Sequence, residues 1–164
     1  MDATPFRFNV DWNYRTIGLF LVLLALPNLL GMINISTPFG FTIHFFQLAI
    51  FLAAAIYGPS GGLLSGAIGS AYSAIAMSNP YIAVGNAILG FFAGLFMRYG
   101  LNLVLAVALA FTIQLPWLIL TDYFLVGMPL QTIGLLVLAL AVSNTVWAGI
   151  TQITYQGLKD AAHA

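Results

Sequence analysis

Long apolar runs alternate along this chain with short breaks of Gly, Pro, Asn and Ser. A helix that crosses a membrane needs about 20 mostly apolar residues, and the residues in the breaks favour turns. Reading from break to break predicts spans over about residues 14–33, 43–57, 60–77, 81–98, 101–126 and 130–158. We therefore expect one domain, residues 1–164, with an all-α integral membrane fold of six transmembrane helices.

The second and third predicted spans are short for a membrane helix. A five-span arrangement with one re-entrant segment is therefore an alternative to six spans. A transmembrane β-barrel is disfavoured, because its strands would show alternating rather than continuous apolar residues.

The composition points to lipid as the main solvent. The chain is 62% hydrophobic and 5% charged, with a mean hydropathy of +1.02, whereas soluble domains carry about 25% charged residues. The formal net charge is zero, so there is no basic surface of the kind that binds nucleic acid. The chain has no cysteine, which excludes disulfides and thiolate chemistry.

The basic residues predict an orientation. With six spans, Arg7, Arg15, Arg98 and Lys159 all lie on one side of the membrane, and this side is the cytoplasm by the positive-inside rule. Both termini are then cytoplasmic. Among the acidic residues, Asp122 alone falls on the outer side.

Small residues recur at helical spacing in the third predicted span. Gly58, Gly62 and Gly66 form one stripe, and a second stripe follows on another face at Ser65, Gly69 and Ser73. Such stripes let helix backbones approach closely in a membrane. Gly90 and Gly94 repeat the spacing in the fourth span, so we expect the third span to be central and to touch neighbours on both sides.

No catalytic motif is present. The glycine-rich stretch at residues 58–62 has no lysine, so it is not a phosphate-binding loop. The two histidines do not pair at metal-ligand spacing, and a Ser-His-Asp set could be assembled only from scattered residues without a nucleophile motif. We expect no enzyme activity, no cofactor and no metal.

Polar and aromatic residues do gather toward the outer half of the bundle. Gln114, Trp117 and Thr121 share one helix face, and Asn144 lies near mid-membrane, where a polar group is costly and tends to face a cavity. Structural roles are the alternatives: Trp117 in the interfacial aromatic belt, Asn144 between helices and Asp122 in solvent. The candidate substrate-binding residues are Thr42, His44, Tyr81, Gln114, Trp117, Thr121, Asp122, Gln131 and Asn144.

Two stretches resemble a known family. Residues 43–69, which include Ala53-Ala54-Ala55-Ile56-Tyr57-Gly58-Pro59-Ser60-Gly61-Gly62, resemble the second and third spans of S-components of energy-coupling factor (ECF) vitamin transporters. Residues 86–98 are similar to the fourth span of those proteins, which often has a G-x-x-A-G-L run before a basic turn. The two stretches cover about a quarter of the chain.

The resemblance implies a multi-pass protein in the cell membrane of a prokaryote that binds a vitamin-like small molecule from outside. It places the pocket at residues 39–44, 81–85, 114–122 and 131–144. The implied partners are a membrane coupling protein and two ATP-binding cassette ATPase subunits, since S-components have no ATPase of their own. Many S-components carry A-x-x-x-A in the first span for docking, and Gly18 to Ala25 departs from that pattern.

The candidate residues also suggest a type of cargo. They include one acid, several amides and aromatic rings, and no Lys or Arg. A neutral or weakly cationic heteroaromatic vitamin or precursor fits such groups better than a phosphorylated one. The other functions left open are a structural or assembly membrane protein without cargo and a stand-alone secondary carrier with Asp122 at an ion site.

Overall fold

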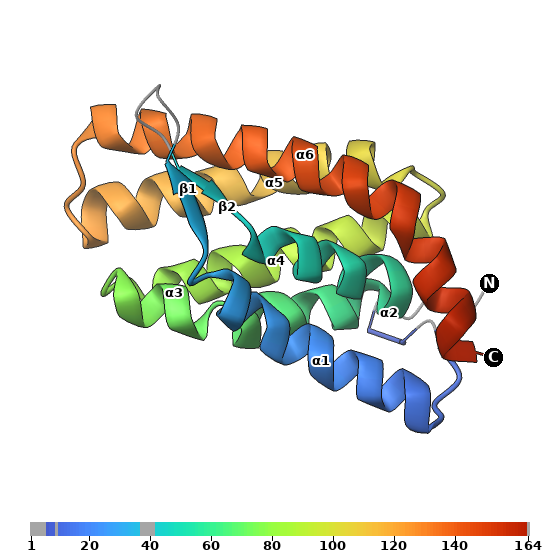
Figure 1. Cartoon of the computed structure of the whole chain (residues 1–164). Coiled ribbons are helices and arrows are strands. Elements are labelled where there is room, and N and C mark those ends of the chain that lie inside the picture. The colour runs from blue at the N-terminus through green and yellow to red at the C-terminus, as the bar shows by residue number, and fades with distance from the viewer. Residues whose placement is uncertain (1–5, 9, 37–41, 164) are drawn as a thin grey trace.

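The computed structural model describes residues 6–8, 10–36 and 42–163, and shows a helical bundle with one short hairpin (Figure 1). The strands β1 (Asn34–Ser36) and β2 (Thr42–His44) pair antiparallel. The helices are α1 (Tyr14–Leu30), α2 (Phe46–Gly69), α3 (Ala71–Ala76), α4 (Tyr81–Arg98), α5 (Leu103–Leu120), the π-helical turn η1 (Thr121–Leu125) and α6 (Leu130–His163).

The helix α2 reverses direction at Gly58. This residue has φ 76° and ψ −159°, a conformation that glycine adopts readily and other residues do not, and Pro59 follows it. A Cβ added at Gly62 would lie 2.9 Å from the Ala54 side chain, although eight residues of straight helix would separate the two by about 12 Å. The two halves of α2 therefore lie side by side as a helical hairpin.

The second half of α2 packs against α4 with almost no side chain between the two backbones. A Cβ added at Gly62 would come closer than 3.0 Å to the Gly90 carbonyl oxygen, and one at Gly66 would come as close to the Asn86 carbonyl. A Cβ at Gly94 would lie 2.6 Å from the backbone of Gly58. The predicted glycine stripes are thus confirmed as the contact between these helices.

The opposite face of the same half of α2 packs against α1. Ser65 donates a 2.7 Å hydrogen bond to the Leu23 carbonyl, and a Cβ at Gly69 would lie 2.5 Å from the Pro27 ring. In the first half of α2, Tyr57 also bonds α1 by donating a 2.6 Å hydrogen bond to the Thr16 carbonyl. The prediction that this segment is central, with neighbours on both sides, is confirmed.

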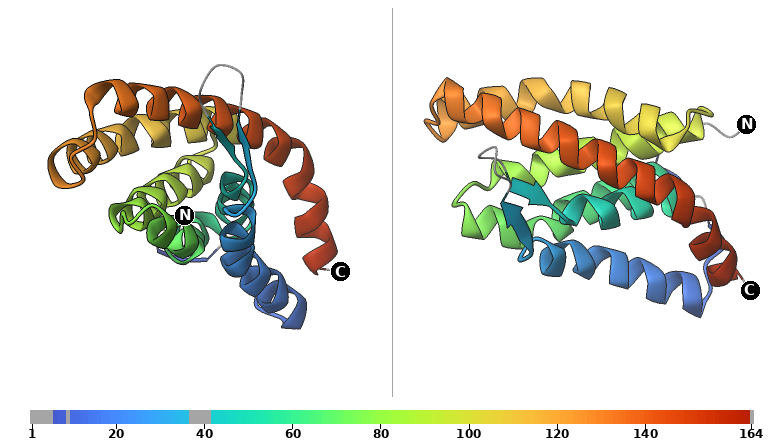
Figure 2. Two further views of the ribbon diagram at one scale, coloured as in Figure 1. Left: turned by 60° about the vertical axis from the view of Figure 1, so that its left-hand side comes forward. Right: turned by 45° about the horizontal axis from the view of Figure 1, so that its top comes forward.

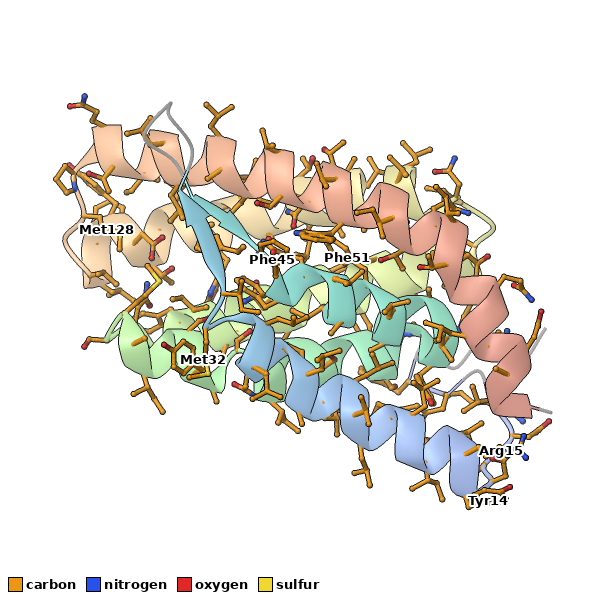
Figure 3. All side chains as sticks on the ribbon, in the orientation of Figure 1. Tyr14, Arg15, Met32, Phe45, Phe51 and Met128 are labelled. Atoms are coloured by element: carbon orange, nitrogen blue, oxygen red, sulfur yellow. The ribbon has the colours of Figure 1, made fainter. Side chains whose placement is uncertain are left out.

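The helices α5 and α6 form a second layer over α4 and α2 (Figure 2). The core between the layers is apolar and includes Phe46, Ile50 and Phe51 from α2, Leu89 from α4 and Val107 from α5, all of them buried. Phe45 and Phe51 point into the space between α2 and α6 (Figure 3).

The charges are distributed as the sequence predicts. Tyr14 and Arg15 lie at one end of the bundle and Met128 at the other (Figure 3). Arg98, at the end of α4, donates a hydrogen bond to the Arg7 carbonyl, and the last turns of α6, which carry Lys159, lie at the same end (Figure 1). We call this the basic end.

The predicted spans correspond to the helices to different degrees. The bounds of α4 match the predicted span 81–98, while α1 stops at Leu30 and α6 runs past 158. Four helical segments of the described chain are long and apolar enough to cross a membrane, over residues 46–76, 81–98, 103–125 and 130–161, and α1 is a shorter apolar helix of 17 residues. The multi-pass helical fold is confirmed, and the count of six spans stays a prediction. The β1–β2 hairpin was not predicted.

The α2–α4 contact makes a direct prediction about stability. Gly62→Ala introduces a methyl group that overlaps the Gly90 carbonyl, and backbone atoms on both sides cannot move aside cheaply. We expect a loss of at least about 2 kcal/mol of unfolding free energy, measured by thermal unfolding of the purified protein in nanodiscs.

Gly134→Ala in α6 is the matched control, because nothing lies within 4 Å of the added methyl group. It should leave stability unchanged or raise it by up to about 1 kcal/mol through helix propensity. Equal melting temperatures for the two variants would show that α2 and α4 do not touch through their backbones.

Candidate functional site

A cavity opens at the end of the bundle opposite the basic end. It is bounded by α4, α5, η1 and α6, with β2 and the α3 region closing one side, and it holds about 620 Å³ of unoccupied space including its mouth. We call it the end cavity. Its lining residues are His44, Phe46, Ser73, Met77, Asn79, Tyr81, Ile82, Gly85, Asn86, Gln114, Trp117, Leu118, Thr121, Asp122, Met128, Leu136 and Leu140.

A buried carboxyl group sits at one end of this cavity. Asp122 is 5% exposed and accepts a 2.8 Å hydrogen bond from the Asn79 side-chain amide. The same Asn79 accepts a bond from the Tyr81 backbone N–H through its side-chain oxygen. Asn79 therefore connects the start of α4 to η1 and holds Asp122 in place.

Aromatic rings form the next part of the wall. The Trp117 indole N–H donates a 3.1 Å hydrogen bond to the Tyr81 carbonyl, and the two rings meet edge to face with centroids 6.4 Å apart. Gly85 lies beside them, and a Cβ there would come within 3.3 Å of both Trp117 and Gln114. The glycine thus lets α4 approach α5 while leaving room in the cavity.

Amide groups line the part of the cavity on the other side of Trp117, away from Asp122. Gln114 is 4% exposed and its Nε2 faces Asn86 Oδ1 at 3.5 Å. Asn86 in turn donates a 2.7 Å hydrogen bond to the Ser70 hydroxyl. Gln114 Oε1 is buried and has no hydrogen-bond partner, so this residue of the cavity lining carries an unsatisfied acceptor.

His44 closes the side of the cavity that faces α6. Its carbonyl accepts a 2.7 Å hydrogen bond from the Trp147 indole, and its N–H lies 3.4 Å from the Ser143 hydroxyl. Burial lowers the pKa of His44 below its ordinary value, because an apolar environment disfavours the charged imidazole. Burial therefore favours the uncharged form of the ring.

The structure brings most of the predicted site residues together and leaves three outside. The six that line the end cavity are His44, Tyr81, Gln114, Trp117, Thr121 and Asp122. Gln131 is exposed on the first turn of α6 and is not among the lining residues. Asn144 is buried beside the cavity rather than in its wall, with both amide atoms unpartnered. The backbone of Thr42 belongs to β2, and its side chain lies outside the described structure.

Asn79 and Asn86 were not predicted as site residues. Asn79 belongs to the Ser-Asn-Pro break between two predicted spans, and Asn86 shares a helix face with Gly90, which favours a packing role over a binding role. The clue available for Asn79 was its position one residue before Pro80, where a side chain can bond the backbone of the following turn.

The lining combines aliphatic and aromatic side chains with a few amide, hydroxyl, imidazole and carboxyl groups. None of the described lining residues is Lys or Arg. In the described part of the chain, no group of three His, Cys, Asp or Glu side chains is placed to hold a metal ion. The cavity suits an uncharged or weakly cationic ligand with an aromatic portion.

The family model described as "ECF-type riboflavin transporter, S component" matches residues 11–157. The chain belongs to this family. No curated protein and no solved structure matched the chain.

Membership fixes the general class of protein. The S-component family is a family of membrane transport subunits for vitamin uptake rather than of enzymes, as predicted from the sequence. The matched region contains all of the helices from α1 to α5 and most of α6.

The Asn79–Asp122 hydrogen bond predicts an energetic coupling. In a double-mutant cycle of Asn79→Ala and Asp122→Ala, we expect a coupling free energy of about 1–3 kcal/mol, because each single variant leaves a buried polar group unpaired. The unfolding free energies of the four proteins would be measured in nanodiscs.

Asn28 provides the matched control, because its side chain forms hydrogen bonds with the Ile68 carbonyl and the Tyr72 N–H rather than with η1. A cycle of Asn28→Ala with Asp122→Ala should be additive within about 0.5 kcal/mol. Additivity in the Asn79 cycle as well would mean that the two side chains are not paired.

Proposed function

We propose that this S-component captures riboflavin in the end cavity, as the substrate-binding subunit of an ATP-driven importer. The observation that carries the proposal is the arrangement along α5 and η1. Trp117 lies between Gln114 and Asp122 along this segment, all three line the end cavity, and the two polar residues are buried. The matching family is described by its riboflavin transport.

The chemistry of the ligand agrees with the cavity. Riboflavin is uncharged, with a planar heteroaromatic ring and a hydroxyl-bearing chain. A ring can pack on Trp117 and Tyr81, and N–H and O–H donors can meet Gln114 Oε1 and the Asp122 carboxyl group. The sequence prediction of a neutral heteroaromatic cargo included this type of molecule.

The proposed topology follows the charges. The basic end carries Arg7, Arg15, Arg98 and the last turns of α6, so we assign it to the cytoplasm. Both termini are then cytoplasmic, and the end cavity opens outward in the cell membrane of a prokaryote. We count six spans, because the reversal at Gly58 divides α2 into two segments that run in opposite directions.

The proposed partners are a membrane coupling protein and two ATP-binding cassette ATPase subunits, as the S-component family implies. Riboflavin capture would be a property of this chain alone, whereas inward release would need ATP hydrolysis by the partners. Binding and transport can therefore be tested separately.

Titration of the purified protein with riboflavin tests the capture step. Flavin fluorescence should be quenched saturably at one ligand per protein, because the ring would lie against Trp117. Trp117→Ala removes the ring from the cavity wall and should weaken binding at least about tenfold. Trp12→Ala is the matched control, because Trp12 packs on Phe8, Phe20 and Tyr57 near the basic end.

The phosphorylated flavin tests the charge of the cavity. Flavin mononucleotide carries the same ring with a dianionic phosphate, for which no Lys or Arg is available among the described lining residues. We expect it to bind at least about tenfold more weakly than riboflavin, since an unpaired charge in a largely buried site is unfavourable. Absence of riboflavin binding would refute the proposed cargo, and equal binding of the phosphate would refute the proposed site.

A further inference from the structure

Three buried polar side chains form a chain of hydrogen bonds from α2 to the end cavity. Ser70 follows the last residue of α2, Asn86 lies on α4 and Gln114 on α5, and their exposed fractions are 0%, 5% and 4%. We call this chain the amide relay. It ends at Gln114, which lines the end cavity and whose buried Oε1 has no hydrogen-bond partner.

The direction of the relay is set at Ser70. Its hydroxyl donates a 2.6 Å hydrogen bond to the Gly66 carbonyl, one turn back. A hydroxyl has one proton, so Ser70 Oγ can only accept from Asn86. Asn86 must therefore present its Nδ2 to Ser70, at 2.7 Å.

The remaining amide orientations follow from this. With Nδ2 of Asn86 turned to Ser70, its Oδ1 faces α5 and can only accept. Gln114 then presents Nε2 to Asn86, at 3.5 Å, and its Oε1 is turned away from the relay. An amide whose oxygen and nitrogen could exchange places in isolation is thus fixed in one orientation.

We infer that Ser70 and Asn86 are positioning residues that keep the acceptor of Gln114 facing the end cavity, so that the site selects a ligand ring with an N–H donor. This inference rests on the proposed function. It goes further by naming the ligand group that is recognised and the residues that impose the choice.

The geometry also orients the ligand. Gln114 and Asp122 are eight residues apart, which is about 12 Å along a helix. Asp122, Asn79 and Thr121 offer several polar groups at one end of the cavity, whereas the other end has one unpartnered acceptor, at Gln114. The hydroxyl-bearing chain of riboflavin suits the former, and the imide N–H of its ring suits the latter.

The experiment compares riboflavin with its N3-methyl derivative, which lacks the imide N–H. The wild-type protein should bind riboflavin at least about tenfold more tightly, because the methylated ring leaves Gln114 Oε1 unsatisfied. Gln114→Leu should reduce the ratio of the two dissociation constants, N3-methylriboflavin to riboflavin, severalfold. Ser70→Ala should also reduce it, because Asn86 and Gln114 are then free to exchange their oxygen and nitrogen positions.

Two controls separate the relay from general stability. Ser70→Thr keeps the hydroxyl and should retain the wild-type ratio. Ser65→Ala removes another buried hydroxyl of α2, one that bonds the Leu23 carbonyl in α1. It should also retain the ratio even if the protein becomes less stable.

The outcomes are distinguishable. If the wild-type protein binds neither flavin, the proposed cargo fails and this inference fails with it. If it binds both flavins equally, the proposed function stands and the donor selectivity is overturned. If the wild-type protein prefers riboflavin over the N3-methyl derivative and Ser70→Ala shows the same preference, Gln114 recognises the ring N–H without Ser70. The positioning role of Ser70 is then overturned.

Discussion

The close backbone contact between the second half of α2 and α4 is the constraint on which the rest of the molecule depends. In lipid there is little hydrophobic gain from bringing two helices together, so van der Waals packing and hydrogen bonds must hold them. The two backbones approach each other where Gly62 meets Gly90 and where Gly66 meets Asn86. A side chain at either glycine of α2 would prevent this approach. Because the same half of α2 also bonds α1 through Ser65, it fixes both neighbours at once.

The site follows from this contact. Asn86 is in the α2–α4 interface through its backbone and in the end cavity through its side chain. The register that places its carbonyl against Gly66 also brings its amide to Ser70, and from there the hydrogen bonds reach Gln114. Across the cavity, Asn79 performs a similar function for Asp122. Helix packing and the positions of the polar groups around the end cavity therefore depend on the same contacts.

Much of this could be predicted from the sequence, because stripes of small residues and breaks at Gly-Pro and Asn-Pro have few structural interpretations in an apolar chain. The bounds of α4 and the two packing faces of residues 60–77 were predictable on that basis. The six cavity residues of β2, α4, α5 and η1 were selected instead because polar and aromatic residues gather in the outer half of the predicted spans. The roles of Asn79 and Asn86 were not, since they depend on which side chains from other helices come to face them. Asn144 was predicted from its depth in the membrane, but depth does not determine which way a helix face is turned.

We propose that a flavin ring binds in the end cavity against Trp117, between Gln114 and Asp122. The decisive measurement is an experimental structure of the purified protein with riboflavin. We expect density for the ring beside Trp117, with the ring N–H toward Gln114 and the hydroxyl-bearing chain toward Asp122. Riboflavin bound elsewhere on the bundle, or an end cavity filled by the protein's own side chains, would contradict it.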